Sequence, residues 1–240
     1  MANNDLNSTT GRRHFLGSLA SGAAALGIAT IAPSVNIHAE NKPNLPADDP
    51  DAWFNKVKGK HRIVYDATRT HEAFPFVWPK VFLLTNAATG TPESDCGVVV
   101  ILRHEAIAYA FEDRIWAKYN FAELLKVDNL GKSFQAADAA TAAKSRNPFW
   151  KPKAGDFKIP GFGSVPIGIN DLQASGVMFC VCNAAMTVYS NVAADQKKMK
   201  QEDVMKDWMD GLLPGIQVVP SGVWAVGRAQ EHGCAYCFAG

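Results

Sequence analysis

The chain has 240 residues, nearly half of them apolar, which is enough to bury the core of one domain. Its 24 basic and 23 acidic residues give a formal charge of +1, and they form no basic stripe or lysine-rich tail. Nucleic acid and anionic membrane surfaces are therefore poor candidate partners. After residue 39, no stretch is apolar enough to span a bilayer.

The N-terminal residues have the composition of an export signal. Arg12 and Arg13 stand just ahead of an uncharged run of small and apolar residues that ends at Ala32. Paired arginines in this position resemble the twin-arginine (Tat) signal of bacteria. The run is broken by three glycines and is shorter than the roughly 20 apolar residues of a membrane-spanning helix. We therefore predict recognition by the Tat translocase, cleavage after Ala39 and a periplasmic location without a membrane anchor.

Residues 40–51 are rich in proline and acidic residues, which predicts a flexible spacer. The folded part is expected to begin near Trp53, and we assign residues 40–58 to the linker and residues 59–240 to the domain. The first strand is predicted over residues 61–66 by their β-branched and aromatic content. A polar loop and a helix follow, with Pro79 in the first helical turn and Gly90 at the helix end. This arrangement is a first strand–helix unit.

The same order recurs along the chain. Residues 97–102 form a continuous apolar run, which is typical of a strand buried on both faces of a parallel sheet. Residues 104–119 carry apolar side chains at helical spacing. Further strands are predicted at residues 177–182, 216–220 and 234–238. Strands that alternate with helices predict an α/β fold with a mostly parallel sheet, covered by helices on both faces.

Residues 126–168 interrupt this alternation. The part around residues 135–144 is rich in alanine and predicts one helix, and the remainder is rich in proline, glycine and aromatic residues. An insertion of this length inside a compact domain is usually functional or part of an interface. Its Phe and Trp side chains favour packing against another surface, such as a neighbouring subunit.

Polar and nucleophilic side chains follow the predicted strands. In open parallel sheets, binding sites form beyond the carboxyl ends of the strands, which share one edge of the sheet. The residues at these ends are Thr68, Arg69, His71, His104, Glu105, Cys182, Asn183 and Ser221.

Cys182 is the strongest candidate nucleophile at this edge. A cysteine at a strand-to-helix junction faces unpaired main-chain N–H groups and the positive end of the helix, and both favour the thiolate. The alternative is a structural thiol that fills space under the helix, for which Asn183 is the predicted cap. The companion candidates are His71 and His104 for proton transfer or thiolate stabilisation, and Arg69, Asn183 and Ser221 for substrate binding.

Four segments carry a resemblance to a known family. Residues 176–183 (GVMFCVCN) resemble the glycine–strand–cysteine segment of the DsrE/DsrF-like family. Residues 213–223 (LPGIQVVPSGV) resemble its strand-to-helix segment, and residues 228–233 (RAQEHG) its closing helix. Residues 102–106 are a weaker match to its second strand and the following loop. The resemblance covers most of residues 60–238 and is strongest in the last third.

The resemblance implies a flavodoxin-like, three-layer α/β/α domain that assembles as a trimer or hexamer. It also implies sulfur handling, with a sulfur atom carried as a persulfide on a cysteine, and only Cys182 matches that position. The chain departs from the family in its export signal, in the insertion over residues 126–168, and in the C-x-x-C formed by Cys234 and Cys237. We therefore expect an exported sulfane-sulfur carrier or transferase.

The five cysteines leave alternatives open. An odd number leaves at least one thiol without an intramolecular partner in a compartment that favours disulfides, although Cys234 and Cys237 could pair. No cofactor is expected for sulfur transfer. If their strands were neighbours, Cys180, Cys182, Cys234 and Cys237 would instead offer four thiolates to zinc, copper or an iron–sulfur cluster. A third alternative is a non-catalytic oligomeric binding module with cysteines in its core.

Overall fold

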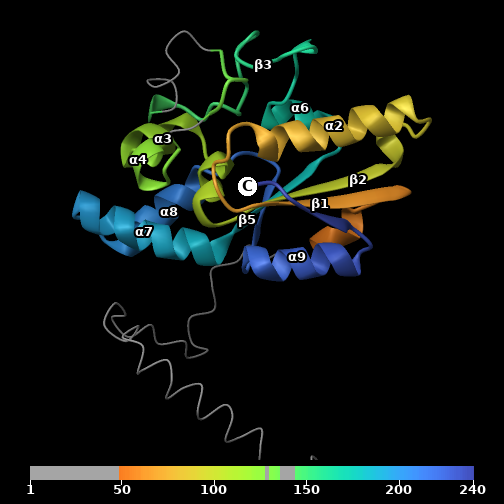
Figure 1. Cartoon of the computed structure of the whole chain (residues 1–240). Coiled ribbons are helices and arrows are strands. Elements are labelled where there is room, and N and C mark those ends of the chain that lie inside the picture. The colour runs from red at the N-terminus through yellow and green to blue at the C-terminus, as the bar shows by residue number, and fades with distance from the viewer. Residues whose placement is uncertain (1–48, 128–129, 136–143) are drawn as a thin grey trace, which may run out of the picture. The chain divides into compact units, whose positions relative to one another are not determined.

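The computed structural model describes residues 49–127, 130–135 and 144–240 (Figure 1). The predicted export signal and its cleavage site after Ala39 lie outside these residues, as does most of the alanine-rich helix predicted near residues 135–144. Within the described ranges, no helix has the length and apolarity that crossing a membrane requires.

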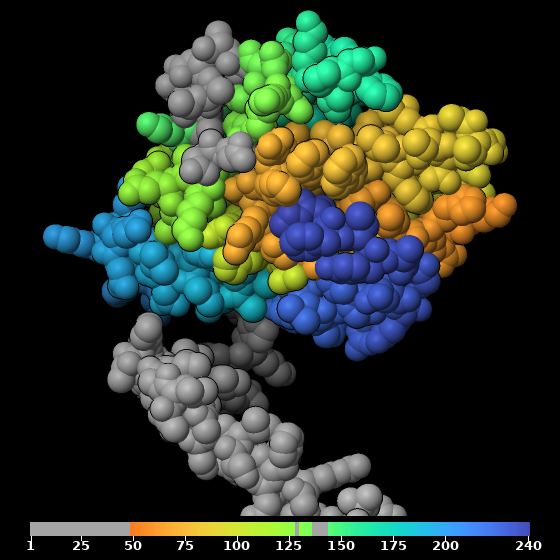
Figure 2. Space-filling view, in the orientation of Figure 1, coloured from red at the N-terminus to blue at the C-terminus, as the bar shows by residue number. Residues whose placement is uncertain are grey.

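Five strands form one sheet in which all neighbours are parallel. They are β1 (His61–Ala67), β2 (Cys96–Leu102), β5 (Met178–Cys182), β6 (Ile216–Val219) and β7 (Ala235–Phe238), and their spatial order is β6-β5-β2-β1-β7. All seven residues of β2 are buried, which explains its unbroken apolar run, and β7 forms an edge at the surface of the molecule (Figure 2). The predicted three-layer α/β/α, flavodoxin-like fold class is confirmed.

The direction of each crossover decides which face of the sheet its helices cover. From β1 through β2 and β5 to β6, the chain moves one strand at a time in the same direction. Right-handed crossovers then place all the connecting helices on one face. These helices are α2 (Phe74–Ala88), α3 (Asp113–Tyr119), α4 (Phe121–Leu124), α6 (Ile169–Ala174), α7 (Asn183–Lys197) and α8 (Gln201–Asp210).

Helix α9 (Gly222–Glu231) carries the chain back across the sheet from β6 to β7. Because this crossover runs in the opposite direction, the same handedness places α9 on the other face. Figure 1 shows α9 and α2 on opposite sides of the sheet. A larger core joins one face to α2 and the other connecting helices, and a smaller core lies under α9.

The smaller core corrects the predicted spacer over residues 40–58. The 3₁₀ helix η2 (Ala52–Lys56) packs into this core through Trp53 and Phe54, and Phe54 is fully buried. The Phe54 ring contacts Trp224 of α9 edge to face, with 5.9 Å between ring centroids. Helix η2 therefore belongs to the folded domain, because these two aromatic side chains fill the space beside α9.

Helix α2 begins earlier than predicted. Its first residue is Phe74, with Pro75 in the first turn, so that Pro79 lies inside the helix and not at its start. Proline suits the first turn because the N–H group that it lacks would have no helical partner there. Pro75 occupies that first-turn position, so the proline that marks the helix start is Pro75 and not Pro79.

Residues 104–119 do not form the single helix that their spacing predicted. The 3₁₀ helix η4 (His104–Ala110) comes first, and α3 begins only at Asp113. Between them, Phe111 is extended and forms an isolated β-bridge with Leu212. Every residue of η4 after His104 is buried, so tertiary packing outweighs the local preference for a continuous α-helix.

The insertion over residues 126–168 packs on its own chain. Phe149 stacks on Phe76 of α2, with 4.0 Å between ring centroids, and on Phe157, with 4.6 Å. All three rings belong to the larger core, whereas Phe162 of the insertion is 76% exposed. The insertion also contains a short hairpin of β3 (Lys158–Ile159) and β4 (Gly163–Ser164).

Asn147 holds the insertion against the domain. Its fully buried side chain donates from Nδ2 to the main-chain oxygens of Tyr109 and Phe111, both at 2.9 Å. Its Oδ1 accepts from the N–H of Phe149 at 3.0 Å, and its own N–H donates to Asp113 at 2.9 Å. One amide side chain therefore satisfies three buried main-chain groups.

Replacing this amide should destabilise the domain. Asn147→Ala leaves three main-chain groups unpaired in the core, and we expect a loss of roughly 3 kcal/mol in the free energy of unfolding. The control is Asn191→Ala on the exposed side of α7, where we expect a change within about 0.5 kcal/mol. Urea unfolding followed by tryptophan fluorescence measures both, and equal losses would contradict the anchoring role of Asn147.

Candidate functional site

The strand order creates a crevice between the carboxyl ends of β5 and β6. Strand β5 leads into α7, which packs in the larger core, whereas β6 leads into α9 on the other face. The two loops therefore leave the sheet in opposite directions, and ligands of open parallel sheets bind at such a switch point. Cys182 and Ser221 stand at these two strand ends. The loops are joined by a hydrogen bond from the N–H of Ala184 to the oxygen of Pro220, at 3.2 Å.

Both of these residues cap the helices that follow them. The Sγ atom of Cys182 accepts the N–H of Ala185 at 3.3 Å at the start of α7. The Oγ atom of Ser221 accepts the N–H of Trp224 at 3.2 Å at the start of α9. Two helix N-termini therefore meet at the crevice, and their N–H groups and dipoles favour negative charge there.

Asn183 does not cap α7 as predicted. It is the first residue of the helix, because the thiol of Cys182 already occupies the cap position. Its side chain is buried, and its main-chain oxygen accepts from the hydroxyl of Thr187 at 3.0 Å. Asn183 therefore lies at the crevice but presents little of its amide to a substrate.

A buried ion pair borders the crevice. The Asp66 carboxylate on β1 is 2% exposed and accepts two hydrogen bonds from the guanidinium of Arg103, at 2.6 and 2.9 Å. The hydroxyl of Tyr236 on β7 donates to the same carboxylate at 3.0 Å. The Arg103 side chain lies against Gly222 at the start of α9, where an added Cβ would come within 2.5 Å of the Cβ of Arg103. Residue 222 must therefore be glycine, because any larger side chain would collide with the side chain of Arg103.

The ion pair also fixes a positive charge near Cys182. The hydrogen bonds to Asp66 are the main cause of the raised pKa of Arg103, and electrostatic attraction to Tyr236 and Cys182 adds to it. The guanidinium of Arg103 is therefore fixed in place by Asp66, within electrostatic range of the Cys182 sulfur.

Neither Asp66 nor Arg103 was selected from the sequence. A signal was present, because a carboxylate within a predicted buried strand requires a partner. Arg103, which follows the neighbouring strand β2, is the cation that can pair with the Asp66 carboxylate.

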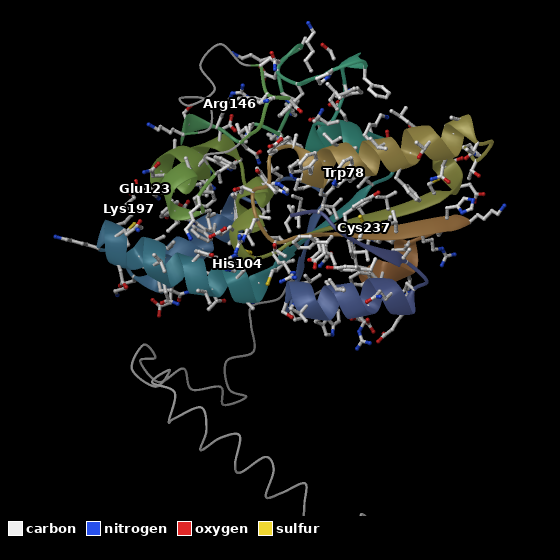
Figure 3. The ribbon with its side chains drawn as sticks, in the orientation of Figure 1. Trp78, His104, Glu123, Arg146, Lys197 and Cys237 are labelled. Atoms are coloured by element: carbon white, nitrogen blue, oxygen red, sulfur yellow. The ribbon has the colours of Figure 1, made fainter. Side chains whose placement is uncertain are left out.

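His104 also lies at this end of the sheet (Figure 3). Leu102 of β2 is in register with Val181 of β5, so that the residues after them emerge side by side. His104 has a φ of 52°, an uncommon value for a residue other than glycine. Its Nε2 atom lies 3.4 Å from the hydroxyl of Tyr189 on α7, and burial raises the pKa of Tyr189. The loop is thus held against α7 with the imidazole exposed.

Arg69 and His71 are not brought together with Cys182. They follow β1, which is separated from β5 by β2. The N–H groups of Thr68 and Arg69 donate to the main-chain oxygen of Gly240 at 2.7 and 3.1 Å, and His71 packs against Gly240. These residues shape a separate part of the edge, at the ends of β1 and β7.

The alternative four-cysteine metal site does not fit the strand order. Cys180 and Cys182 belong to β5, whereas Cys234 and Cys237 belong to the β7 segment, with β2 and β1 between them. Three strand spacings of about 4.8 Å separate the pairs by roughly 14 Å, whereas zinc–sulfur bonds are about 2.3 Å long. In the parts of the chain that the structure describes, no group of three or more His, Cys, Asp or Glu side chains is arranged for a metal ion.

A disulfide between Cys234 and Cys237 does not form either. Cys234 is buried in the smaller core, whereas Cys237 packs beside the larger core on the other face of the sheet. All five cysteines are free thiols. Burial raises the pKa of Cys96, Cys180 and Cys237, and it raises the pKa of Cys234 to about 11. These four thiols are therefore poor candidates for a thiolate nucleophile.

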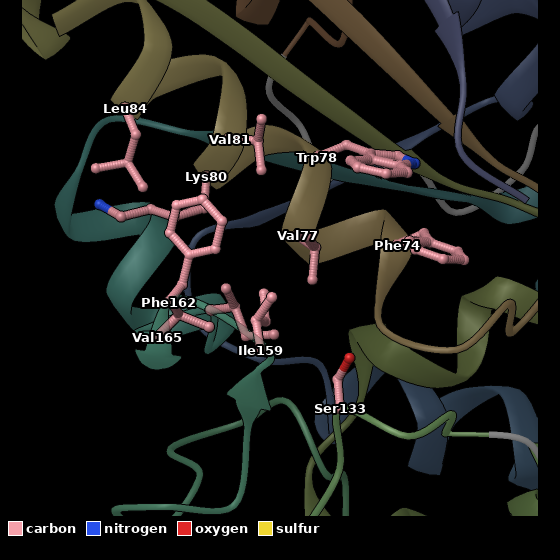
Figure 4. A pocket seen from close by; sticks show the side chains of 11 residues that line it. Phe74, Val77, Trp78, Lys80, Val81, Leu84, Ser133, Ile159, Phe162 and Val165 are labelled. Atoms are coloured by element: carbon pink, nitrogen blue, oxygen red, sulfur yellow. The ribbon is translucent and has the colours of Figure 1, made fainter. Parts of the chain in front are cut away.

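An apolar cavity of about 250 Å³ lies between α2 and the β3–β4 hairpin (Figure 4). Its walls combine one side of α2 with residues of the insertion, including Val77, Trp78, Val81, Leu84, Ile159 and Phe162. The polar side chains that line it are Ser133 and Lys80, and the lysine is paired with Glu93 at 3.2 Å. The cavity shares none of its lining residues with the crevice.

The buried ion pair should be essential to stability. Arg103→Met leaves the Asp66 carboxylate without its cation, and we expect a loss of roughly 3–5 kcal/mol in the free energy of unfolding. Adding Asp66→Asn to this variant should recover part of the loss, because no charge is then buried. Urea unfolding of the wild type, of Arg103→Met and of Arg103→Met with Asp66→Asn measures the free energy of unfolding of each protein.

The matched control is Arg114→Met, because Arg114 is exposed and pairs with Glu112 and Asp207 at the surface. We expect this control to cost at most about 1 kcal/mol. Similar losses for Arg103→Met and Arg114→Met would contradict a special role for the buried pair.

No family model matches the chain, and no curated protein matches it. Among solved structures, the chain is similar to a protein of unknown function, MTH1491 from Methanobacterium thermoautotrophicum, at 17% sequence identity. The alignment covers 75% of this chain and 99% of the other, with a TM-score of 0.34.

Proposed function

We propose that this protein is a sulfane-sulfur carrier that holds sulfur as a persulfide on Cys182. The observation that carries the proposal is the position of its Sγ atom, which caps α7 at the switch-point crevice and accepts the N–H of Ala185 at 3.3 Å. A main-chain N–H and a helix N-terminus both favour the thiolate. The resemblance of residues 176–183 to the DsrE/DsrF-like family supports the same residue.

The chemistry requires a nucleophile and a sulfide leaving group. The Cys182 thiolate attacks the terminal sulfur of hydrodisulfide, HSS⁻. A new sulfur–sulfur bond forms as the donor's sulfur–sulfur bond breaks, and HS⁻ leaves with the electron pair. The products are the anionic persulfide Cys–S–S⁻ and HS⁻, so charge and electrons balance without an added oxidant. An acceptor thiolate takes the outer sulfur by the same step in reverse.

The surroundings of Cys182 give the other residues distinct roles in this proposal. Arg103, held by Asp66, supplies a fixed positive charge to the anionic donor and the persulfide. Ser221 holds the start of α9, whose N–H groups face the same crevice. His104 is the candidate for proton transfer to the leaving sulfide or the acceptor. Because Cys182 is only 6% exposed, small inorganic polysulfides suit it better than bulky donors.

The setting of the proposed reaction is the periplasm, reached through the Tat translocase. Paired arginines ahead of an uncharged run support this location. The family resemblance supports assembly as a trimer or hexamer. Neither inference depends on the identity of the sulfur acceptor.

Sulfur uptake should depend on Cys182. After treatment with polysulfide, the wild-type chain should gain one sulfur atom, and Cys182→Ser should lower this uptake at least about tenfold because the nucleophilic sulfur is lost. Intact-mass measurement and peptide mapping of all five cysteines give the amount and the position of the added sulfur. Cys237→Ser removes a more exposed thiol and should load like wild type. Equal uptake by Cys182→Ser and wild type would exclude the proposed carrier.

The apolar cavity favours a second candidate function, a non-catalytic module that binds a small apolar ligand. Sites of this kind are concave and mostly apolar, with a few polar groups that orient the ligand. The cavity beside α2 has this character, with Ser133 and Lys80 as its polar groups.

A charge placed in the cavity should abolish such binding. Val81→Asp puts a carboxylate in the apolar wall, and we expect the affinity for the probe 8-anilinonaphthalene-1-sulfonate to fall at least about tenfold. The control Val188→Asp makes the same change at an exposed position on α7 and should leave binding unchanged. Fluorescence titration measures both, and equal affinities of the two variants would count against this second function.

A further inference from the structure

Strand β7 is an edge strand with main-chain groups free for pairing. Among the strands that the structure describes, it is bonded to β1 alone, and the N–H of Ala239 donates to the oxygen of Asp66 at 3.0 Å. Successive residues of a strand direct their main-chain groups to opposite sides, so Cys237 also faces β1. The N–H and C=O groups of Tyr236 and Phe238 therefore point to the open edge, where the oxygen of Phe238 also accepts a weak hydrogen bond from the Sγ of Cys237 at 3.7 Å.

The same edge exposes aromatic side chains. Phe238 is 59% exposed and Tyr236 is 47% exposed, and Figure 2 shows the C-terminal residues in the darkest blue at the surface that faces the viewer. Trp78 of α2 is also exposed, and its main-chain oxygen accepts from the hydroxyl of Tyr65 at 3.1 Å. Tyr65 and its register partner Cys237 pack with the larger core under α2, so Trp78 lies on the face of the sheet opposite to the side chains of Tyr236 and Phe238.

The two edge strands are equally short, with four residues each, but they differ in the residues that prevent strand pairing. Proteins protect open edges with proline, lysine, inward-pointing charges or bulges, and β7 (Ala235–Phe238) contains none of these. The opposite edge differs, because β6 runs into Pro220. Of the two edges, β7 is the one suited to receive another strand.

We propose that β7 pairs antiparallel with β7 of a second copy of this chain, about a two-fold axis at Cys237. In this register Tyr236 of each copy lies opposite Phe238 of the other. Each such pair exchanges two hydrogen bonds, so that all the outward main-chain groups of both residues are used. A two-fold interface uses the same surface on both copies, and the contact joins two five-stranded sheets into one of ten strands.

The side chains favour a second copy over an unrelated extended peptide. Residues directly opposite in an antiparallel pair share a face of the sheet, so each Tyr236 ring meets a Phe238 ring of the other copy. Aromatic pairs in this position stabilise antiparallel strands. The two pairs are related by symmetry and bring four exposed rings together over one face. A peptide would satisfy the main chain but would not supply this complementary pair of rings.

The register places the two Cys237 residues opposite each other at a non-hydrogen-bonded position. Their Cα atoms would be about 4.5 Å apart, which is inside the range of about 4.4–6.8 Å that a disulfide requires. Cys237 is also the most exposed of the five cysteines. A disulfide between copies therefore reports this register directly.

The first experiment treats the full chain with oxidised glutathione and separates the products without reductant. Two Cys237 thiols pass two electrons and two protons to one glutathione disulfide, which gives one disulfide between copies and two reduced glutathione molecules. We expect a linked dimer from wild type, Cys96→Ser and Cys234→Ser, and none from Cys237→Ser. Linkage through any other cysteine would overturn the proposed register.

The second experiment measures assembly without cross-linking. Phe238→Lys places a protecting charge on the edge without removing a bond to β1, and it should convert dimers to monomers in light-scattering measurements. The matched control Phe162→Lys changes an exposed aromatic residue in the insertion and should leave the dimer intact. The Tyr236 and Phe238 amides should also exchange hydrogen more slowly as protein concentration rises. A wild-type monomer at all concentrations, or a trimer without Cys237 linkage, would refute the pairing, whereas a hexamer of Cys237-linked dimers would support it.

Discussion

The handedness of the crossovers is the constraint on which the rest of this structure depends. Three successive crossovers run in one direction and place their helices on one face, and the return through α9 must then take the other face. That reversal alone opens the crevice between β5 and β6 and brings two helix N-termini together there. It also leaves β7 beside β1 at the far edge. The candidate thiol site and the candidate interface thus have one topological origin.

The Asp66–Arg103 pair ties these two regions together. Asp66 lies on β1, Arg103 follows β2, and Tyr236 reaches the same carboxylate from β7. The aliphatic stem of Arg103 in turn lies against Gly222 at the start of α9, and its guanidinium is within electrostatic range of Cys182. Burying a charge is costly unless it is paired and hydrogen bonded, so the three elements are held in one arrangement. The interaction that orients the cation near the thiol also holds the edge strand in place.

Much of the fold could be predicted from the sequence, because apolar runs such as residues 97–102 identify buried parallel strands directly. The composition of the site could be predicted only in part. Cys182 and Ser221 were identified because strand ends gather at one edge. The placement of Arg69 and His71, and the separation of Cys180 from Cys234, depend instead on strand order, which local patterns do not encode. The cap on α7 was assigned to Asn183 because a thiol is a rarer acceptor than an amide.

The distance in sequence between β1 and β7 has a consequence for synthesis. Tyr236 lies 170 residues after Asp66, so a ribosome must make almost the whole described domain before the buried carboxylate acquires its third hydrogen bond. Contacts of such long separation form late and slow the folding of a nascent chain. A chain that ends before β7 would lack both this hydrogen bond and the strand that pairs with β1.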